Sequence, residues 1–289
     1  MCGLFGMLLP HRYPTHLLRR DAALAFLGVL AEERGRHGAG IAALLPTTPD
    51  GGWAVKRHPG TFTQLMGPRR LRGLVDATAA IGHTRWATQG VINLANTSPL
   101  QAGSLLGTHN GDLDPDSIPQ TGGPRTGDAT DSQLLFAALS TAHRGGRLRL
   151  ERVVRVLSNV RGRAALAWTD TTRADGRVWL ARGGLSPLAV LVDDDGAVWW
   201  ASNPGWLRGI RPDGEVRLLH EGTIWALTPR RSQVTVQHLA SFKPTVRPYD
   251  DRISAVWRGF SAADRWDDRT QLRHRVHPAA TLTSFAVPS

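Results

Sequence analysis

Residues 1–10 of the chain read MCGLFGMLLP, and the cysteine at position 2 is the only one among 289 residues. One interpretation is structural, because a free cysteine often packs as a small hydrophobe and the apolar run from Leu4 to Leu9 predicts a buried first strand. The other interpretation is chemical. Cysteine is small enough for the methionine before it to be removed, which would leave Cys2 with a thiol beside a free α-amine. That amine titrates near neutrality and could accept the proton of the thiol, as in N-terminal nucleophilic catalysis.

The composition predicts a soluble, cytoplasmic protein with a substantial core. Hydrophobic residues make up 41% of the chain, which is enough for such a core. The length of 289 residues fits one large domain or two small ones. Pro10 and Arg12 interrupt the N-terminal apolar run, so a signal peptide is not expected, and no apolar run is long enough to cross a bilayer. A single cysteine excludes an internal disulfide and a cysteine-only metal site. We expect neither a metal nor a cofactor.

The net charge is +11, and only two of the 35 basic residues, Lys56 and Lys243, are lysines. A charge of this size permits an anionic partner, but the preference for arginine over lysine is also typical of a GC-rich genome. The arginines are spread along the chain without the aromatic-interleaved basic stripe of nucleic-acid-binding proteins. Nucleic acid is therefore not an expected partner.

The hydrophobic pattern predicts strands and helices in blocks, which is typical of an antiparallel, layered α+β fold. Helices are predicted over residues 15–34, capped by Thr15, over 131–143, with Asp131 as N-cap, and over 150–160. Short strands are predicted over residues 4–9, 41–45, 53–56, 79–84, 164–168, 178–181, 188–192, 198–201 and 223–227. Beyond about residue 242 the regularity is lost, so residues 243–289 are predicted to be an arm or a tail.

Three further stretches carry residue types suited to chemistry: RGRHGAGIA at 34–42, GHTRWATQG at 82–90, and THNGDL at 108–113 followed by TDSQLLF at 130–136. The planar fork of Arg85 suits a carboxylate. Asn110 and Gly111 fit either a hairpin turn or an oxyanion hole. Asp131 could cap a helix or bind an ammonium group. Taken singly, each stretch also has an ordinary structural explanation.

Taken together and in this order, these motifs resemble those of the class II glutamine amidotransferases, which are N-terminal-nucleophile (Ntn) hydrolases. The residues of these motifs are most similar to those of the glutaminase domain of glucosamine-6-phosphate synthase, and the resemblance covers roughly residues 2–230. It implies a four-layer αββα sandwich of two antiparallel sheets flanked by helices. We therefore expect a glutaminase domain over residues 2–242, followed by the arm.

The resemblance also implies roles for individual residues. Cys2, freed of Met1, would attack the side-chain amide of glutamine, and the resulting γ-glutamyl thioester would be hydrolysed to glutamate after ammonia leaves. Asn110 and Gly111 would hold the oxyanion. Arg85 would bind the α-carboxylate and Asp131 the α-ammonium. The remaining residues implied are Trp86 and Thr88 in the substrate pocket and Arg34, Gly35 and Gln89 behind it.

The sequence departs from the family pattern at several positions. His37-Gly38 replaces Asp-Ser or Asp-Ala, Gln89 stands where histidine is frequent, and Pro115 stands where asparagine is common. These departures leave two alternatives open: a non-catalytic, glutamine-binding or regulatory protein with the Ntn fold, and a hydrolase of another γ-glutamyl amide.

About 45 residues follow the Ntn region, too few for an ammonia-using domain, so a separate acceptor subunit, a synthetase or an amidoligase, is expected. Trp257, Phe260 and Trp266 would either dock that subunit or fold back over the protein's own sheets.

Overall fold

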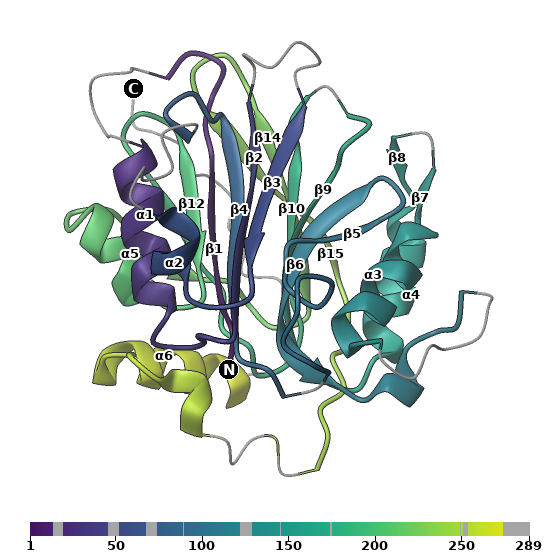
Figure 1. The fold of residues 1–289 in the computed structure, drawn as a ribbon. Coiled ribbons are helices and arrows are strands. Elements are labelled where there is room, and N and C mark those ends of the chain that lie inside the picture. Colours follow the sequence, from purple (N-terminus) through teal and green to yellow (C-terminus); the bar gives the residue numbers. More distant parts are fainter. Residues whose placement is uncertain are drawn as a thin grey trace.

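The computed structural model describes residues 1–13, 20–45, 52–67, 74–88, 90–121, 129–144, 146–173, 175–248, 250 and 254–273. Two antiparallel sheets pack face to face, and helices cover both outer faces, so the molecule has four layers (Figure 1). This is the predicted αββα sandwich.

The first sheet has seven strands, and the strand that follows Cys2 lies in its middle. Their order is β13 (Val216–Leu218), β11 (Ala189–Val192), β12 (Val198–Ala201), β1 (Gly3–Leu8), β4 (Ala79–Arg85), β2 (Gly38–Leu44) and β3 (Trp53–His58). β1 pairs antiparallel with β12 on one side and with β4 on the other, where Gly3 lies opposite Thr84.

The second sheet has six strands. Their order is β15 (Val234–Ser241), β14 (Thr223–Pro229), β10 (Val178–Arg182), β9 (Gly162–Asp170), β6 (Leu105–Leu113) and β5 (Leu100–Ala102). A separate two-stranded ribbon pairs β7 (His143–Arg144) with β8 (Arg147–Leu148).

The helices divide between the two outer faces (Figure 1). α1 (Arg20–Ala31), α2 (Phe62–Met66) and α5 (Pro204–Ile210) cover the first sheet, and α3 (Asp131–Ser140) and α4 (Leu150–Asn159) cover the second. The short 3-10 helix η2 (Pro115–Ser117) follows β6. The 3-10 helix η4 (Ser254–Trp257) and the helix α6 (Ala262–Arg273) lie in the C-terminal segment. None of the helices in the described part of the chain is long and apolar enough to cross a membrane.

The side chains of β1 point alternately to the two faces of the first sheet, and this explains how the layers are held together and where Cys2 lies. Leu4 and Leu8 pack between the two sheets, whereas Phe5 and Met7 pack against the helices of the first sheet. Because side chains alternate with a period of two along a strand, Cys2 lies on the same side as Leu4. The thiol is therefore at the end of the sandwich, on the side that faces the second sheet.

The predicted strands are all present, but three predictions about helices are wrong. The helix predicted over residues 131–143 ends at Ser140, and His143 begins β7. The first helix ends at Ala31 rather than Arg34, because residues 32–34 form tighter turns in which the Arg34 N–H donates to the Ala31 carbonyl; Thr15 lies outside the described residues. Asp131 is not an N-cap. Thr130 caps α3 in a capping box with Gln133, which places Asp131 in the first turn.

The interpretation of Asn110-Gly111 as a hairpin turn is also wrong, since β6 runs straight through both residues. The pattern gave no indication of β6 as a strand, because its residues alternate between apolar and polar only in part. β13, β15 and the short helices α2 and α5 were likewise not predicted.

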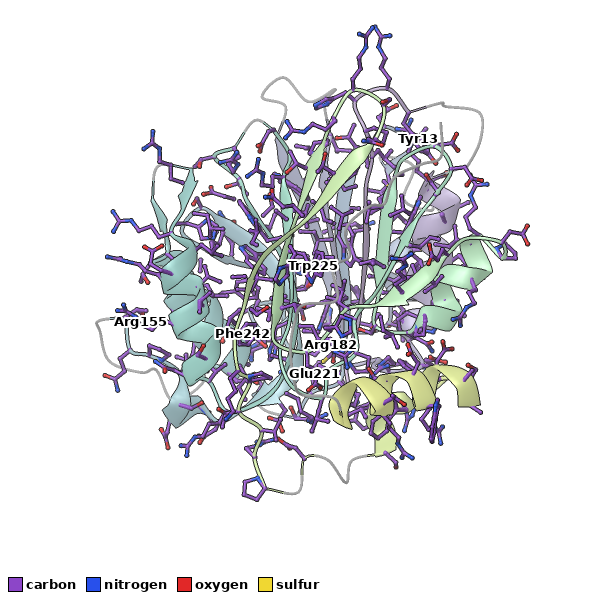
Figure 2. The ribbon with its side chains drawn as sticks, turned by 180° about the vertical axis from the view of Figure 1, so that it is seen from behind. Tyr13, Arg155, Arg182, Glu221, Trp225 and Phe242 are labelled. Atoms are coloured by element: carbon purple, nitrogen blue, oxygen red, sulfur yellow. The ribbon has the colours of Figure 1, made fainter. Side chains whose placement is uncertain are left out.

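The C-terminal segment packs back onto the body. Trp257 and Phe260 are buried in the core beneath α1, and Trp266 is 68% exposed. Arg182 of β10 forms a buried ion pair with Asp268 of α6, 2.5 Å apart. Figure 2 shows Arg182 and Glu221 at the end of the sandwich where α6 lies. Two of the three predicted anchors therefore cover the protein's own sheet.

Candidate active site

Cys2 is held where the ends of β1 and β4 meet. The Trp86 N–H donates to the sulfur at 3.4 Å, and the sulfur lies 3.7 Å from the Trp86 carbonyl oxygen, to which the thiol donates. Only 9% of Cys2 is exposed. Burial raises the pKa of the Cys2 thiol, and the hydrogen bond with Trp86 opposes this shift in part. The thiol therefore needs a base before it can act as a nucleophile.

A pocket opens at Cys2, and both sheets contribute to its walls. Six of the predicted site residues meet there: Cys2, Arg85, Trp86, Thr88, Gly111 and Asp131. The other lining residues are His83, Asn96, Ser98, His109, Thr130 and Ser132. Of the remaining predicted residues, Gln89 lies outside the described part of the chain, and Arg34, Gly35 and Asn110 do not line the pocket.

Opposite charges line this pocket. Arg85, 6% exposed, ends β4, and its Nη1 donates to the Val91 carbonyl at 3.0 Å. Asp131, 8% exposed, accepts the Leu113 N–H and the Ser132 N–H on different oxygens, both at 2.8 Å. The Ser132 hydroxyl also donates to Oδ1 at 3.4 Å, whereas Oδ2, which accepts only the Leu113 N–H among the described contacts, keeps a further acceptor position. A free amino acid, with a carboxylate and an ammonium group, matches this pair of charges.

The Gly111 N–H faces the pocket side of β6. Along an antiparallel strand, successive N–H groups point to opposite sides. The Asp114 N–H points toward β9, to Arg161, whereas the Leu113 N–H points away, to Asp131. Gly111, two residues before Leu113, therefore presents its N–H on the same side as Leu113. A Cβ at Gly111 would lie 1.9 Å from the Arg163 carbonyl oxygen, so only glycine lets β6 approach β9 here.

Asn110 lies beside the pocket rather than in its wall. The side chain is fully buried, and its Nδ2 donates to Ser202 Oγ at 3.1 Å. Its Oδ1 has no hydrogen-bond partner among the described residues. Nδ2 carries a second hydrogen that the Ser202 contact does not use.

Arg34 and Gly35 support the site from behind. Arg34 is buried, and its guanidinium donates to the carbonyls of Val256 at 3.0 Å and Ser202 at 3.5 Å; burial lowers the pKa of Arg34 to about 10. A Cβ at Gly35 would lie 2.6 Å from the Trp86 nitrogen. The peptide that faces Cys2 therefore packs directly against Gly35. Pro115 begins η2 and does not line the pocket.

Two histidines line the pocket that were not among the predicted site residues. The His83 Nε2 donates to the His109 carbonyl at 3.0 Å, and His109 Nδ1 lies 2.9 Å from Ser132 Oγ. Burial lowers the pKa of His83 to about 3, and burial also lowers the pKa of His109. Both shifts favour the neutral ring and make each imidazole a weaker base. Their positions within the His-Thr and His-Asn-Gly motifs could have indicated that both histidines lie near the site.

Comparisons with known proteins find curated relatives that are longer than this chain and resemble part of it. No family model matches the sequence. A glutamine–fructose-6-phosphate aminotransferase (isomerizing) from Thermus thermophilus is 30% identical over 243 residues, 81% of this chain and 37% of that protein. The amidophosphoribosyltransferase of Mus musculus is 32% identical over 39% of this chain and 22% of its own length. The chain thus spans between about a fifth and two fifths of these curated relatives.

Two solved structures share the fold. One is described as the allosteric regulatory enzyme of purine biosynthesis, with a TM-score of 0.61 and 20% identity over 86% of this chain and 51% of that chain. The other is the glutamine phosphoribosylpyrophosphate amidotransferase of B. subtilis, complexed with ADP and GMP, with a TM-score of 0.55 and 18% identity over 86% of this chain and 52% of that chain. At this identity they establish the architecture and nothing finer.

Proposed function

The chain is a homologue of the class II, N-terminal-nucleophile glutamine amidotransferases, and we propose that it hydrolyses the side-chain amide of glutamine to glutamate and ammonia. The observation that carries this proposal is that the thiol of Cys2, Arg85 and Asp131 all line the same pocket. Arg85 would bind the α-carboxylate of glutamine and Asp131 its α-ammonium, which would direct the side-chain amide toward the sulfur.

The proposed reaction begins once Met1 has been removed. The α-amine of Cys2 takes the thiol's proton, and the sulfur attacks the amide carbon to give a tetrahedral intermediate. Its oxyanion would accept the Gly111 N–H and the second hydrogen of Asn110 Nδ2. The carbon–nitrogen bond then breaks, and the ammonium of Cys2 returns its proton to the departing ammonia. Water hydrolyses the thioester, and glutamate leaves.

The surroundings of the N-terminus favour an amine that can act as the base. With Met1 present, burial lowers the pKa of its α-amine to about 6, and the positive charges of Arg34, Arg163 and Arg258 contribute in the same direction, while the thiolate of Cys2 opposes them. The α-amine of a processed Cys2 would be one residue further along in these surroundings. A neutral amine at physiological pH is the form that accepts a proton.

The direct test compares the wild type with Cys2→Ala. We expect the wild type to release equal amounts of glutamate and ammonia, and Cys2→Ala to lose turnover while retaining glutamine binding in calorimetry. Cys2→Ser should keep a trace of activity at most, because a serine alkoxide is harder to form than a thiolate. Unchanged turnover in Cys2→Ala would refute the proposal, and glutamine binding without turnover in the wild type would favour the regulatory alternative. Assays with other γ-glutamyl amides test the second alternative.

The proposal includes an ammonia acceptor on a separate subunit, a synthetase or an amidoligase. Nearly all described residues belong to the sandwich or to the C-terminal segment packed on it, so the acceptor would lie outside the part of the chain that the structure describes. One face of α6 is bound to the body through Asp264 and Asp268, and the opposite face presents Trp266 between arginines. Exposed tryptophan and arginine are enriched at binding hot spots.

A purified candidate acceptor, encoded beside this chain, tests the docking role. We expect Trp266→Ala to abolish its co-purification and to leave basal glutamine hydrolysis unchanged. Val75→Ala is the control, because Val75 is also more than half exposed but lies outside the C-terminal segment. Normal capture by Trp266→Ala would rule out this surface.

A further inference from the structure

His37 lies in the turn between α1 and β2, beside the segment that holds the nucleophile. Its Nδ1 accepts the Ala87 N–H at 3.1 Å, and its ring stacks on Trp86 with centroids 4.9 Å apart and planes inclined by 35°. We propose that His37 is a positioning residue, which holds residues 86–88 so that the Trp86 N–H meets the sulfur of Cys2. The consequence for catalysis rests on the proposed function, whereas the consequence for the thiol does not.

The segment after β4 has little other support. Trp86 is 44% exposed, and Thr88 is exposed as well, so neither side chain is fixed by burial in the core. The turn containing His37 supplies the contacts instead. The His37 N–H donates to the Arg85 carbonyl at 2.9 Å, and Gly35 packs behind the Trp86 nitrogen. The peptide between Arg85 and Trp86 is thereby enclosed by Gly35 on one side and Cys2 on the other.

The two contacts of the His37 side chain are chemically distinct. Because Nδ1 accepts a peptide N–H, the ring is neutral and carries its hydrogen on Nε2. Asparagine places an acceptor oxygen on Cγ, as histidine places Nδ1, so His37→Asn keeps the acceptor and loses the ring. Phenylalanine keeps a ring that can stack on Trp86 and loses the acceptor. His37→Ala removes both contacts at a half-buried position.

The readout is the alkylation of Cys2, which reports on a single site because the chain has one cysteine. Burial raises the pKa of Cys2, and the hydrogen bond from Trp86 stabilises the thiolate and opposes that rise. If His37 holds that N–H in place, its loss moves the pH profile of iodoacetamide alkylation to higher pH. A residue that only stabilised the fold would leave this profile unchanged in folded protein.

We expect the midpoint of alkylation to rise by about 0.5 pH in His37→Phe and by more in His37→Ala. In His37→Asn, the midpoint of alkylation should lie close to the wild-type value, because the acceptor is retained. In the glutamine assay, His37→Phe should raise the KM more than it lowers the kcat, because Trp86 and Thr88 line the pocket. His238→Phe is the matched control: His238 also lies against a tryptophan, Trp225, but on β15 of the other sheet, and it should leave both readouts at wild-type values.

An unchanged alkylation profile in folded His37→Ala would overturn the proposal, and so would equal shifts in His37→Asn and His37→Phe, since the acceptor would then not matter. If His37→Phe does not fold, His37→Ala and His37→Asn still make the comparison. An alkylation shift without any glutamine hydrolysis in the wild type would support the positioning role and refute the proposed function, so the two can fail independently.

Discussion

Helix α3 connects two buried polar clusters that differ in kind. Its first residue, Asp131, lies in the pocket with Cys2, Arg85 and His109. Just beyond its last turn, His143 is enclosed with Trp168, Asp170 and Trp179 of the second sheet. Figure 1 shows α3 running from the end of the sandwich that carries the N-terminus toward the ribbon of β7 and β8. Both clusters contain a buried histidine whose pKa is lowered, mainly by burial.

The side chains of the second cluster contact one another rather than a pocket. The Trp168 Nε1 donates to His143 Nε2 at 3.3 Å, and His143 Nδ1 lies 3.4 Å from an oxygen of Asp170. Trp179 meets the His143 ring edge to face, with centroids 5.1 Å apart. None of these side chains lines the pocket at Cys2. The comparison shows that both clusters contain buried groups with a shifted pKa, whereas only the first adjoins a pocket that contains a thiol.

The largest effect should come from blocking the N-terminus. A non-cleavable extension before Cys2 turns its α-amine into a peptide nitrogen, which has no basicity, so we expect kcat to fall by about 10²- to 10⁴-fold. The same extension at the C-terminus is the control. Intact mass of active protein should show the loss of one methionine. Full activity in a species that retains Met1 would contradict the proposed base.

A smaller effect should come from the charged end of the pocket. Arg85→Lys keeps the charge but loses the bidentate fork, so KM for glutamine should rise by about 10- to 100-fold. An analogue of glutamine whose α-carboxylate is blocked provides the control, because it should be affected much less. Equal weakening of both compounds would show that Arg85 does not bind the carboxylate.

The smallest effect on activity is expected in the second cluster, around His143, where His143→Phe should leave KM and kcat near wild-type values. It removes the acceptor of the Trp168 N–H, so the free energy of unfolding should fall by about 1–3 kcal/mol, measured by urea denaturation. A large loss of activity in folded His143→Phe would contradict the distinction between the two clusters.

The same variant tests the sign of the pH dependence. Burial lowers the pKa of His143 in the folded state, so the unfolded chain binds a proton that the folded chain does not. Stability is therefore full above the ordinary histidine pKa of about 6.5 and declines as the pH falls below it. His143→Phe should show a shallower decline between pH 6.5 and pH 5 than the wild type.

Short sequence motifs were sufficient to predict many of the residues that line the pocket. Cys2, Arg85, Gly111 and Asp131 each stand in a motif of fewer than ten residues, and the structure brings all four to one pocket. The motifs could not show which way Asn110 points, because that depends on Ser202, 92 residues away. Nor could they show Asn96 and Ser98 in the wall, since these residues lie in a polar run without a recognisable motif.

The sequence by itself determined the layered α+β class, because the period-two alternation of strands and the apolar faces of helices are local properties. It also determined which thiol could be proposed as the nucleophile, since the chain has one cysteine. Tertiary structure alone decided the rest. It placed His37 against Trp86 and packed the C-terminal segment onto the body through the ion pair of Arg182 with Asp268. Such contacts join residues far apart in the chain, and their energies depend on burial and on partners that only the folded state supplies.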